Sequence, residues 1–238
     1  MTDAKDTNSM LNALYPFSGS AAGNKPDVRD KSAELLDSIK IKTAESIAAK
    51  QAFFAEYSEM LAEIANTIAQ SYRTGGRLLT AGNGGSSCDA AHLALEFMHP
   101  VTTGRPALPA INLSQDSAML TAVSNDVGFH HVLKRQLLAL AKAEDVLVVF
   151  STSGNSENLT TACEKAKQLG LRVIAFSGGD GGELATNKAV DHCLIVKTDS
   201  VHRIQECHLV CYHILWDLVH TLLADERGFL GEHGRQLD

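Results

Sequence analysis

The sequence lacks several features that would each assign it to a class of proteins. Its 238 residues contain no apolar run near the roughly 20 residues of a membrane span, and its first residues contain no apolar signal-peptide core. Basic residues (21) are outnumbered by acidic ones (28), and the net charge of −7 argues against a general nucleic-acid surface. We therefore expect a cytoplasmic protein that binds neither membranes nor nucleic acid.

Cysteine is scarce and its number is odd, which does not suit a disulfide framework. The five cysteines are Cys88, Cys163, Cys193, Cys207 and Cys211. Free thiols in a reducing cytoplasm are the simplest interpretation, and the last two lie four residues apart, where they would pack on one helix face.

Strand-like and helix-like segments alternate from residue 77 onward, which is typical of an α/β fold with a parallel sheet covered by helices on both faces. The predicted strands are 77–81, 110–113, 145–150, 172–177 and 192–196. The predicted helices are 87–98, 117–124, 130–142, 157–169, 183–186 and 203–223. Before them, residues 27–72 contain no glycine or proline and form one long helix or two. We expect a loose arm (1–26), one domain (27–223) and a mobile tail (224–238).

Two loops follow predicted strands and open helices, which is how a backbone makes an anion site. The first is Gly-Asn-Gly-Gly-Ser-Ser at 82–87, and the second is Ser-Thr-Ser-Gly-Asn-Ser at 151–156. Neither contains the lysine of a nucleotide-triphosphate loop, and no acidic residue follows the first at the dinucleotide spacing. Two hydroxyl-rich loops at strand ends instead favour a sugar phosphate.

Residues that could carry chemistry lie on the helices after these loops. His92 and Glu96 are four apart and share one helix face, and Gln205 and His213 share a face of the last helix. A histidine on an apolar helix is more often a core residue than a catalyst, but a carboxylate between Leu95 and Phe97 is costly to bury without a role. If the four converge, they could hold a divalent metal or act as a base and acid pair.

The last helix is apolar on nearly every side. A helix of that kind has to be buried all round, and one subunit offers too little cover, so we expect an oligomer.

Six motifs stand in a fixed order along the chain. They are Ala-Gly-Asn-Gly-Gly-Ser-Ser at 81–87, His92 with Glu96, Ser-Asn-Asp at 124–126, Ser-Thr-Ser-Gly-Asn-Ser at 151–156, Gly-Gly-Asp-Gly-Gly at 178–182, and Arg-Ile-Gln-Glu at 203–206 with His213. In this order and spacing they resemble the bacterial phosphoheptose isomerases of the sugar isomerase (SIS) fold. The resemblance implies a single SIS domain with a flavodoxin-like parallel sheet, assembled as a homotetramer with active sites between subunits.

The resemblance also implies an activity and its residues. The reaction would convert sedoheptulose 7-phosphate to D-glycero-D-manno-heptose 7-phosphate through an enediol, for heptose precursors such as those of the lipopolysaccharide core. Glu96 would be the general base and His213 the general acid. One zinc ion per subunit would be held by His92, Glu96, Gln205 and His213. The implied substrate contacts are Asn83, Gly84, Gly85, Ser86, Gln115, Asp116, Ser151, Thr152, Ser153, Ser156 and Gln205.

Two alternatives to an enzyme remain at this point. A replication-initiator-binding relative has the same fold but lacks the glutamate and the histidine at positions 96 and 213, whereas this chain keeps both. A sugar-phosphate sensor that regulates transcription would need a DNA-binding segment, and residues 1–72 show neither a basic patch nor a convincing helix-turn-helix.

Overall fold

The computed structural model describes residues 31–102 and 104–224, and the chain divides into two compact units, residues 1–40 and 41–238. The region in which the sequence allowed one helix or two is a single helix, α2 (Ser32–Arg73). In the first unit the described residues are the beginning of α2, where Lys40 pairs with Asp37 at 3.2 Å. The expected arm (1–26) and, apart from residue 224, the expected tail lie outside the described residues.

Five parallel strands form one sheet, as the alternating pattern predicted. They are β1 (Leu78–Gly82), β2 (Ala110–Asn112), β3 (Val146–Phe150), β4 (Arg172–Gly178) and β5 (His192–Val196). Their order in the sheet is β2-β1-β3-β4-β5, and every neighbouring pair is parallel. This is the strand order of flavodoxin-like folds, so the expected fold class is confirmed.

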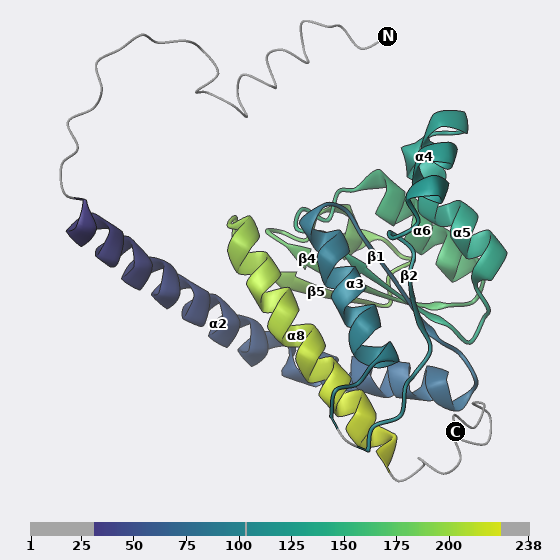
Figure 1. The fold of residues 1–238 in the computed structure, drawn as a ribbon, viewed down its shortest axis with the longest axis horizontal. Coiled ribbons are helices and arrows are strands. Elements are labelled where there is room, and N and C mark those ends of the chain that lie inside the picture. Colours follow the sequence, from purple (N-terminus) through teal and green to yellow (C-terminus); the bar gives the residue numbers. More distant parts are fainter. Residues whose placement is uncertain (1–30, 103, 225–238) are drawn as a thin grey trace, which may run out of the picture. The chain divides into compact units, whose positions relative to one another are not determined.

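Helices cover both faces of the sheet, and each face has its own apolar core (Figure 1). Alternate side chains of a strand point to opposite faces, so Leu78 joins one core and Leu79 the other. The first core lies under the second half of α2, α3 (Gly85–Met98) and α8 (Val201–Leu222). The second lies under α5 (Val132–Leu140), α6 (Glu157–Gln168) and α7 (Gly182–Thr186). None of the described helices combines the length and the hydropathy that a membrane span requires.

Several helix boundaries differ from the sequence prediction by one or two residues, and two of these helices show a local reason. The segment expected as one helix over 130–142 is a short 3-10 turn, η1 (Phe129–His131), followed by α5, which ends at Leu140. The backbone N–H of Lys142 donates instead to the Asp145 carboxylate at 2.9 Å, which holds the turn before β3. At the other end of the chain, α8 begins two residues earlier than expected, because Ser200 serves as its N-cap.

The strand order also locates the topological switch point of the sheet. From β1 the chain crosses to β2 on one side and then returns to β3 on the other, so the connections leaving β1 and β3 diverge. Ligands of such sheets bind at this switch point, outside the carboxyl ends of the strands. Both loops that the sequence singled out, 82–87 and 151–156, follow these two strands.

His208 on α8 is a wholly buried histidine (0 % exposed) that packs against the rings of Phe150 and Phe176. Its Nε2 lies 3.2 Å from the Ser177 carbonyl oxygen. Burial lowers the pKa of His208 from 6.5 to about 4, against the opposing effect of this hydrogen bond. The ring is therefore neutral in the folded protein at physiological pH.

We predict that His208 makes the protein less stable in mild acid. The unfolded chain protonates this ring near pH 6.5 and the folded chain only near pH 4, so the free energy of unfolding falls as the pH drops through that range. The loss from this group is about 3 kcal/mol at most. Urea unfolding at fixed protein concentration should show a shallower pH dependence for His208→Gln than for wild type. The exposed His202 on the same helix provides the control, His202→Gln. Equal slopes for wild type and His208→Gln would contradict the prediction.

Candidate active site

The loop after β1 turns sharply into α3. Gly84 is the N-cap of that helix and has φ +53°, a conformation that glycine adopts at little cost. Gly82 is equally constrained, because a Cβ there would lie 2.3 Å from the Ser86 carbonyl oxygen. The loop therefore presents the N-terminus of α3, with Gly85 and Ser86 in its first turn, at the sheet edge.

The loop after β3 is held in shape by a third, glycine-rich segment. Gly154 has φ +68°, and a Cβ on it would lie 1.9 Å from the Gly181 carbonyl oxygen. Asn155 accepts a hydrogen bond from the Glu183 backbone N–H at 2.9 Å, and its loop thereby contacts the beginning of α7. The glycines at 178–182 thus allow their backbone to contact the backbone of the serine-rich loop, which stabilises the shape of that loop.

The hydroxyl groups of this second loop have different surroundings. Ser151 Oγ is buried and accepts from the Gly154 N–H at 3.0 Å, and Ser153 Oγ accepts from the Asn155 N–H at 3.3 Å. Thr152 and Ser156 are half-buried, and Ser156 is the N-cap residue of α6. Two of the predicted substrate hydroxyls therefore help to shape the loop.

A pair of side-chain amides joins the two loops. Asn83 Nδ2 donates to Asn158 Oδ1 at 2.8 Å, and Asn158 Nδ2 donates to Asn83 Oδ1 at 2.9 Å. Asn83 was predicted from the sequence as a substrate contact, whereas Asn158, which is buried in the first turn of α6, was not singled out. The available signal in the sequence was an amide side chain two residues after the serine-rich loop, at the beginning of a predicted helix.

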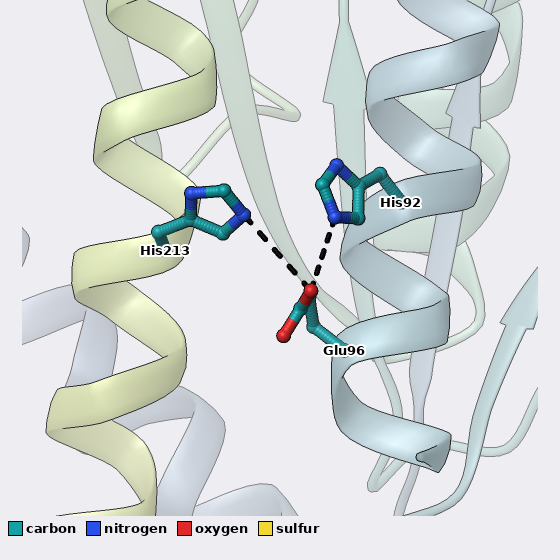
Figure 2. Close-up of side chains that lie close together, drawn as sticks. All are labelled: His92, Glu96 and His213. Atoms are coloured by element: carbon teal, nitrogen blue, oxygen red, sulfur yellow. Dashed lines mark hydrogen bonds and ion pairs between the residues drawn. The ribbon is translucent and has the colours of Figure 1, made fainter. Parts of the chain in front are cut away.

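Glu96 lies between two imidazoles that come from different helices, as Figure 2 shows. Its Oε1 is 3.0 Å from His92 Nε2 on the same helix, α3, and 4.0 Å from His213 Nε2 on α8. The two imidazole rings meet edge to face with centroids 5.0 Å apart. The structure therefore brings together three of the four residues whose convergence the sequence left as a condition.

Neighbouring side chains position the trio. Tyr212, buried beside His213 on α8, has its hydroxyl 2.9 Å from His92 Nδ1, and burial raises the pKa of this tyrosine above its usual range. Trp216 Nε1 donates to the Glu96 backbone carbonyl at 2.8 Å. Both residues lie on α8 and form hydrogen bonds with residues of α3, which link the two helices at the site.

A second carboxyl group lies one helical turn before His92. Burial raises the pKa of Asp89 to about 6, and the charge of His92 acts in the opposite direction. Among the residues that the structure describes, Asp89 Oδ2 is a buried oxygen with no hydrogen-bond partner. Sequence reasoning did not single this residue out.

The remaining predicted residues are at the same edge of the sheet. The Gln205 amide lies over Gly85, where a Cβ would be 2.3 Å from Gln205 Nε2, so it faces the beginning of α3. Gln115 and Asp116 follow β2 and are exposed. The Asp116 carboxylate caps α4 (Ser117–Asp126) by accepting from the Met119 N–H at 2.9 Å.

The trio has the composition and spacing of a zinc site. One ligand atom from each of His92, Glu96 and His213 lies within 4.8 Å of the others. Two ligands of one tetrahedral zinc ion, each about 2.0–2.2 Å from the metal, lie roughly 3.3–3.6 Å apart, and two imidazoles with one carboxylate are a known catalytic set. The separations of 3.0 and 4.0 Å bracket that value, so the residues fit a metal as well as they fit a base and acid pair.

Comparison with known proteins identifies similar chains. The SIS domain family model matches residues 43–178. A phosphoheptose isomerase of Thermodesulfovibrio yellowstonii is 40% identical over 192 residues, which cover 81% of this chain and 94% of that protein. A phosphoheptose isomerase structure from Francisella tularensis has a TM-score of 0.74 at 36% identity and covers 78% of this chain and 98% of its own. One from Neisseria gonorrhoeae has a TM-score of 0.73 at 37% identity, with coverages of 79% and 99%.

We predict that the amides of Asn83 and Asn158 are energetically coupled. Asn158→Ala leaves both polar groups of the Asn83 amide without their partner and should reduce the free energy of unfolding by about 1–3 kcal/mol. In urea unfolding, the double variant Asn83→Ala/Asn158→Ala should lose less than the sum of the single losses. Asn66→Ala is the control, because Asn66 is exposed and bonds only one turn back to Ala62. Additive losses would contradict the coupling.

Proposed function

The chain belongs to the phosphoheptose isomerases of the SIS domain family and is a sugar phosphate isomerase, and from this premise we propose that it interconverts sedoheptulose 7-phosphate and D-glycero-D-manno-heptose 7-phosphate. The single observation that carries the proposal is the position of Glu96. Its carboxylate lies between His92 and His213, on the helix that begins at the loop after β1. A base, an acid and an anion cradle are the groups that such a reaction needs.

The isomerisation moves only protons and needs no oxidant. Glu96 removes a proton from C1 of the open-chain ketose, and His213 gives a proton to the C2 carbonyl oxygen, which leaves an enediol with a C1–C2 double bond. The enediol then loses the proton of its C1 hydroxyl and gains one at C2, which yields the aldose. Glu96 Oε1 and His213 Nε2 are 4.0 Å apart, so both can reach one pair of adjacent carbons.

The phosphate is the group that the two loops would hold. A dianion is stabilised at helix N-termini, and α3 and α6 both begin at this edge of the sheet. We assign the phosphate to Thr152 and Ser156 with the backbone around Ser151 and Ser153. The loop after β1, with Asn83, Gly84, Gly85 and Ser86, would contact the sugar, together with Gln115, Asp116 and Gln205.

A zinc ion, one per subunit, would be held by His92, Glu96 and His213, with Gln205 as a weaker fourth donor. A metal there would supply Lewis-acid polarisation of the sugar oxygens.

The assembly we propose is a homotetramer with active sites between subunits. Large apolar side chains are exposed next to the trio on both helices: Leu95 (51%) and Met98 (45%) on α3, and Leu209 (38%) and Ile214 (36%) on α8. Exposed apolar surface of this kind marks an interaction site. A second copy of the chain that covers it would also enclose Glu96 and His213.

The non-catalytic interaction protein that the sequence left open is disfavoured. Such a relative needs neither a carboxylate base nor an imidazole acid, whereas this chain keeps both and brings them together. We place the reaction in the cytoplasm, where the five free thiols would remain reduced and where heptose precursors of the lipopolysaccharide core, or of a related heptose nucleotide, would be made.

We predict that Glu96→Gln binds the sugar phosphate and fails to turn it over. The amide keeps the shape of the carboxylate and loses its basicity, so kcat should fall by about 10²–10⁴-fold while KM changes little. Product analysis with sedoheptulose 7-phosphate, and solvent deuterium incorporation at the substrate carbon, measure the effect. His99→Gln, an exposed histidine just beyond α3, is the control and should keep full activity. Wild-type protein that converts no heptose phosphate would overturn the proposed function.

We predict a tetramer in solution. Light scattering at micromolar concentration should give about four times the chain mass of 25.5 kDa. Ile214→Glu adds a charge to the apolar surface of α8 and should give smaller species, whereas Leu138→Glu, at an exposed position on α5, should leave the mass unchanged. A monomeric mass for wild type would contradict the assembly.

A further inference from the structure

Tyr212 is a buried residue of α8 whose hydroxyl contacts His92 of the trio. It is 1% exposed, and its ring packs edge to face on Phe150 at the end of β3, with centroids 6.0 Å apart. Tyr212 and His213 are consecutive on α8 and point in different directions. The tyrosine faces the sheet, and the histidine faces Glu96.

The Tyr212 hydroxyl meets the ring nitrogen of His92 that Glu96 does not use. His92 Nε2 is 3.0 Å from Glu96 Oε1, and His92 Nδ1 is 2.9 Å from the tyrosine oxygen. Both nitrogens of the imidazole therefore have a partner, which sets the rotation of the ring as well as its position.

The partners also decide which nitrogen carries the proton. An ionised carboxylate can only accept hydrogen bonds, so in the metal-free protein Nε2 of the neutral His92 ring carries the proton and donates it to Glu96. Nδ1 is then an acceptor, and the Tyr212 hydroxyl donates to it. If Nε2 instead ligated a zinc ion, the proton would be on Nδ1, and the same hydroxyl would accept it.

We propose that Tyr212 is a positioning residue that holds the His92 ring with Nε2 toward Glu96 in both of these states. A hydroxyl suits this role because it can donate and accept, whereas an amide proton or a carbonyl oxygen could serve only one of the two tautomers. The proposal rests on the proposed function for its kinetic consequence. Its structural consequence, the tautomer of His92, is independent of any reaction.

The test is Tyr212→Phe, which keeps the ring on Phe150 and removes only the hydroxyl. Loss of a hydrogen bond behind a metal-ligating histidine typically costs 10–100-fold in metal affinity or activity. We expect zinc affinity and kcat each to fall by about that factor, with KM for sedoheptulose 7-phosphate nearly unchanged, because the hydroxyl bonds to His92 and not to a residue of the two loops.

The tautomer is read directly by nitrogen NMR of the histidine rings. In metal-free wild type, Nε2 of His92 should be the protonated nitrogen, and zinc alone should transfer the proton to Nδ1. In metal-free Tyr212→Phe the preference should weaken toward a mixture. His92→Ala assigns the signal, and zinc titration of that variant shows which part of the binding belongs to this site.

Tyr72→Phe is the matched control. Tyr72 is also a buried tyrosine, it packs on Phe97, and its hydroxyl bonds to the Pro109 carbonyl oxygen away from the trio. This variant should lose neither zinc affinity nor kcat.

Two results would overturn the proposal. One is a metal-free wild type with the proton on Nδ1 of His92, which needs no variant to fold. The other is Tyr212→Phe with unchanged zinc affinity, kcat and tautomer. If wild type fails to isomerise any heptose phosphate, the proposed function falls, while the zinc titration and the NMR signals still decide the role of Tyr212.

Discussion

The packing of α8 against α3 is the constraint on which the site depends. Glu96 and His92 belong to one helix and His213 to the other, so the trio exists only while the two helices keep their spacing and rotation (Figure 1). Trp216 and Tyr212 cross from α8 to α3 and bond to the Glu96 backbone and the His92 ring. The same contacts that close the core on this face therefore set the distance between Glu96 and His213.

The rest of the site follows from the sheet. Parallel strands bring their carboxyl ends to one edge, and the strand order opens that edge between β1 and β3. The loops there are specified by close backbone approaches, such as that of Gly154 to Gly181, and by the reciprocal amides of Asn83 and Asn158. Several polar groups that sequence patterns assign to a ligand thus have a partner within the protein, and they give the loops a defined shape before any ligand binds.

The two helices that carry the trio are apolar on an exposed side as well as on a packed one. Leu95, Met98, Leu209 and Ile214 leave apolar area exposed on α3 and α8, while the opposite sides of these helices are fully packed. The last helix is apolar on nearly every side, but a single chain buries only part of that apolar surface. This exposed apolar surface is the physical reason for proposing that a second subunit covers the site.

The sequence by itself determined the class of the fold and the local parts of the site. Alternation of apolar strands with helical periodicity predicted a parallel sheet, and the strand-to-helix loops at 82–87 and 151–156 were evident from glycine and hydroxyl residues. The His92–Glu96 contact follows from a spacing of four on one helix, which is local geometry.

Only the tertiary structure decided how the helices meet. The approach of His213 to Glu96, the Asn83–Asn158 amide pair and the bond from Tyr212 to His92 join residues 117, 75 and 120 positions apart. Helical periodicity predicts which residues share a face but not which face of another helix they contact, because that choice depends on how side chains interdigitate across the whole core. The raised pKa of Asp89 belongs to the same category, since it arises from burial that a linear pattern does not contain.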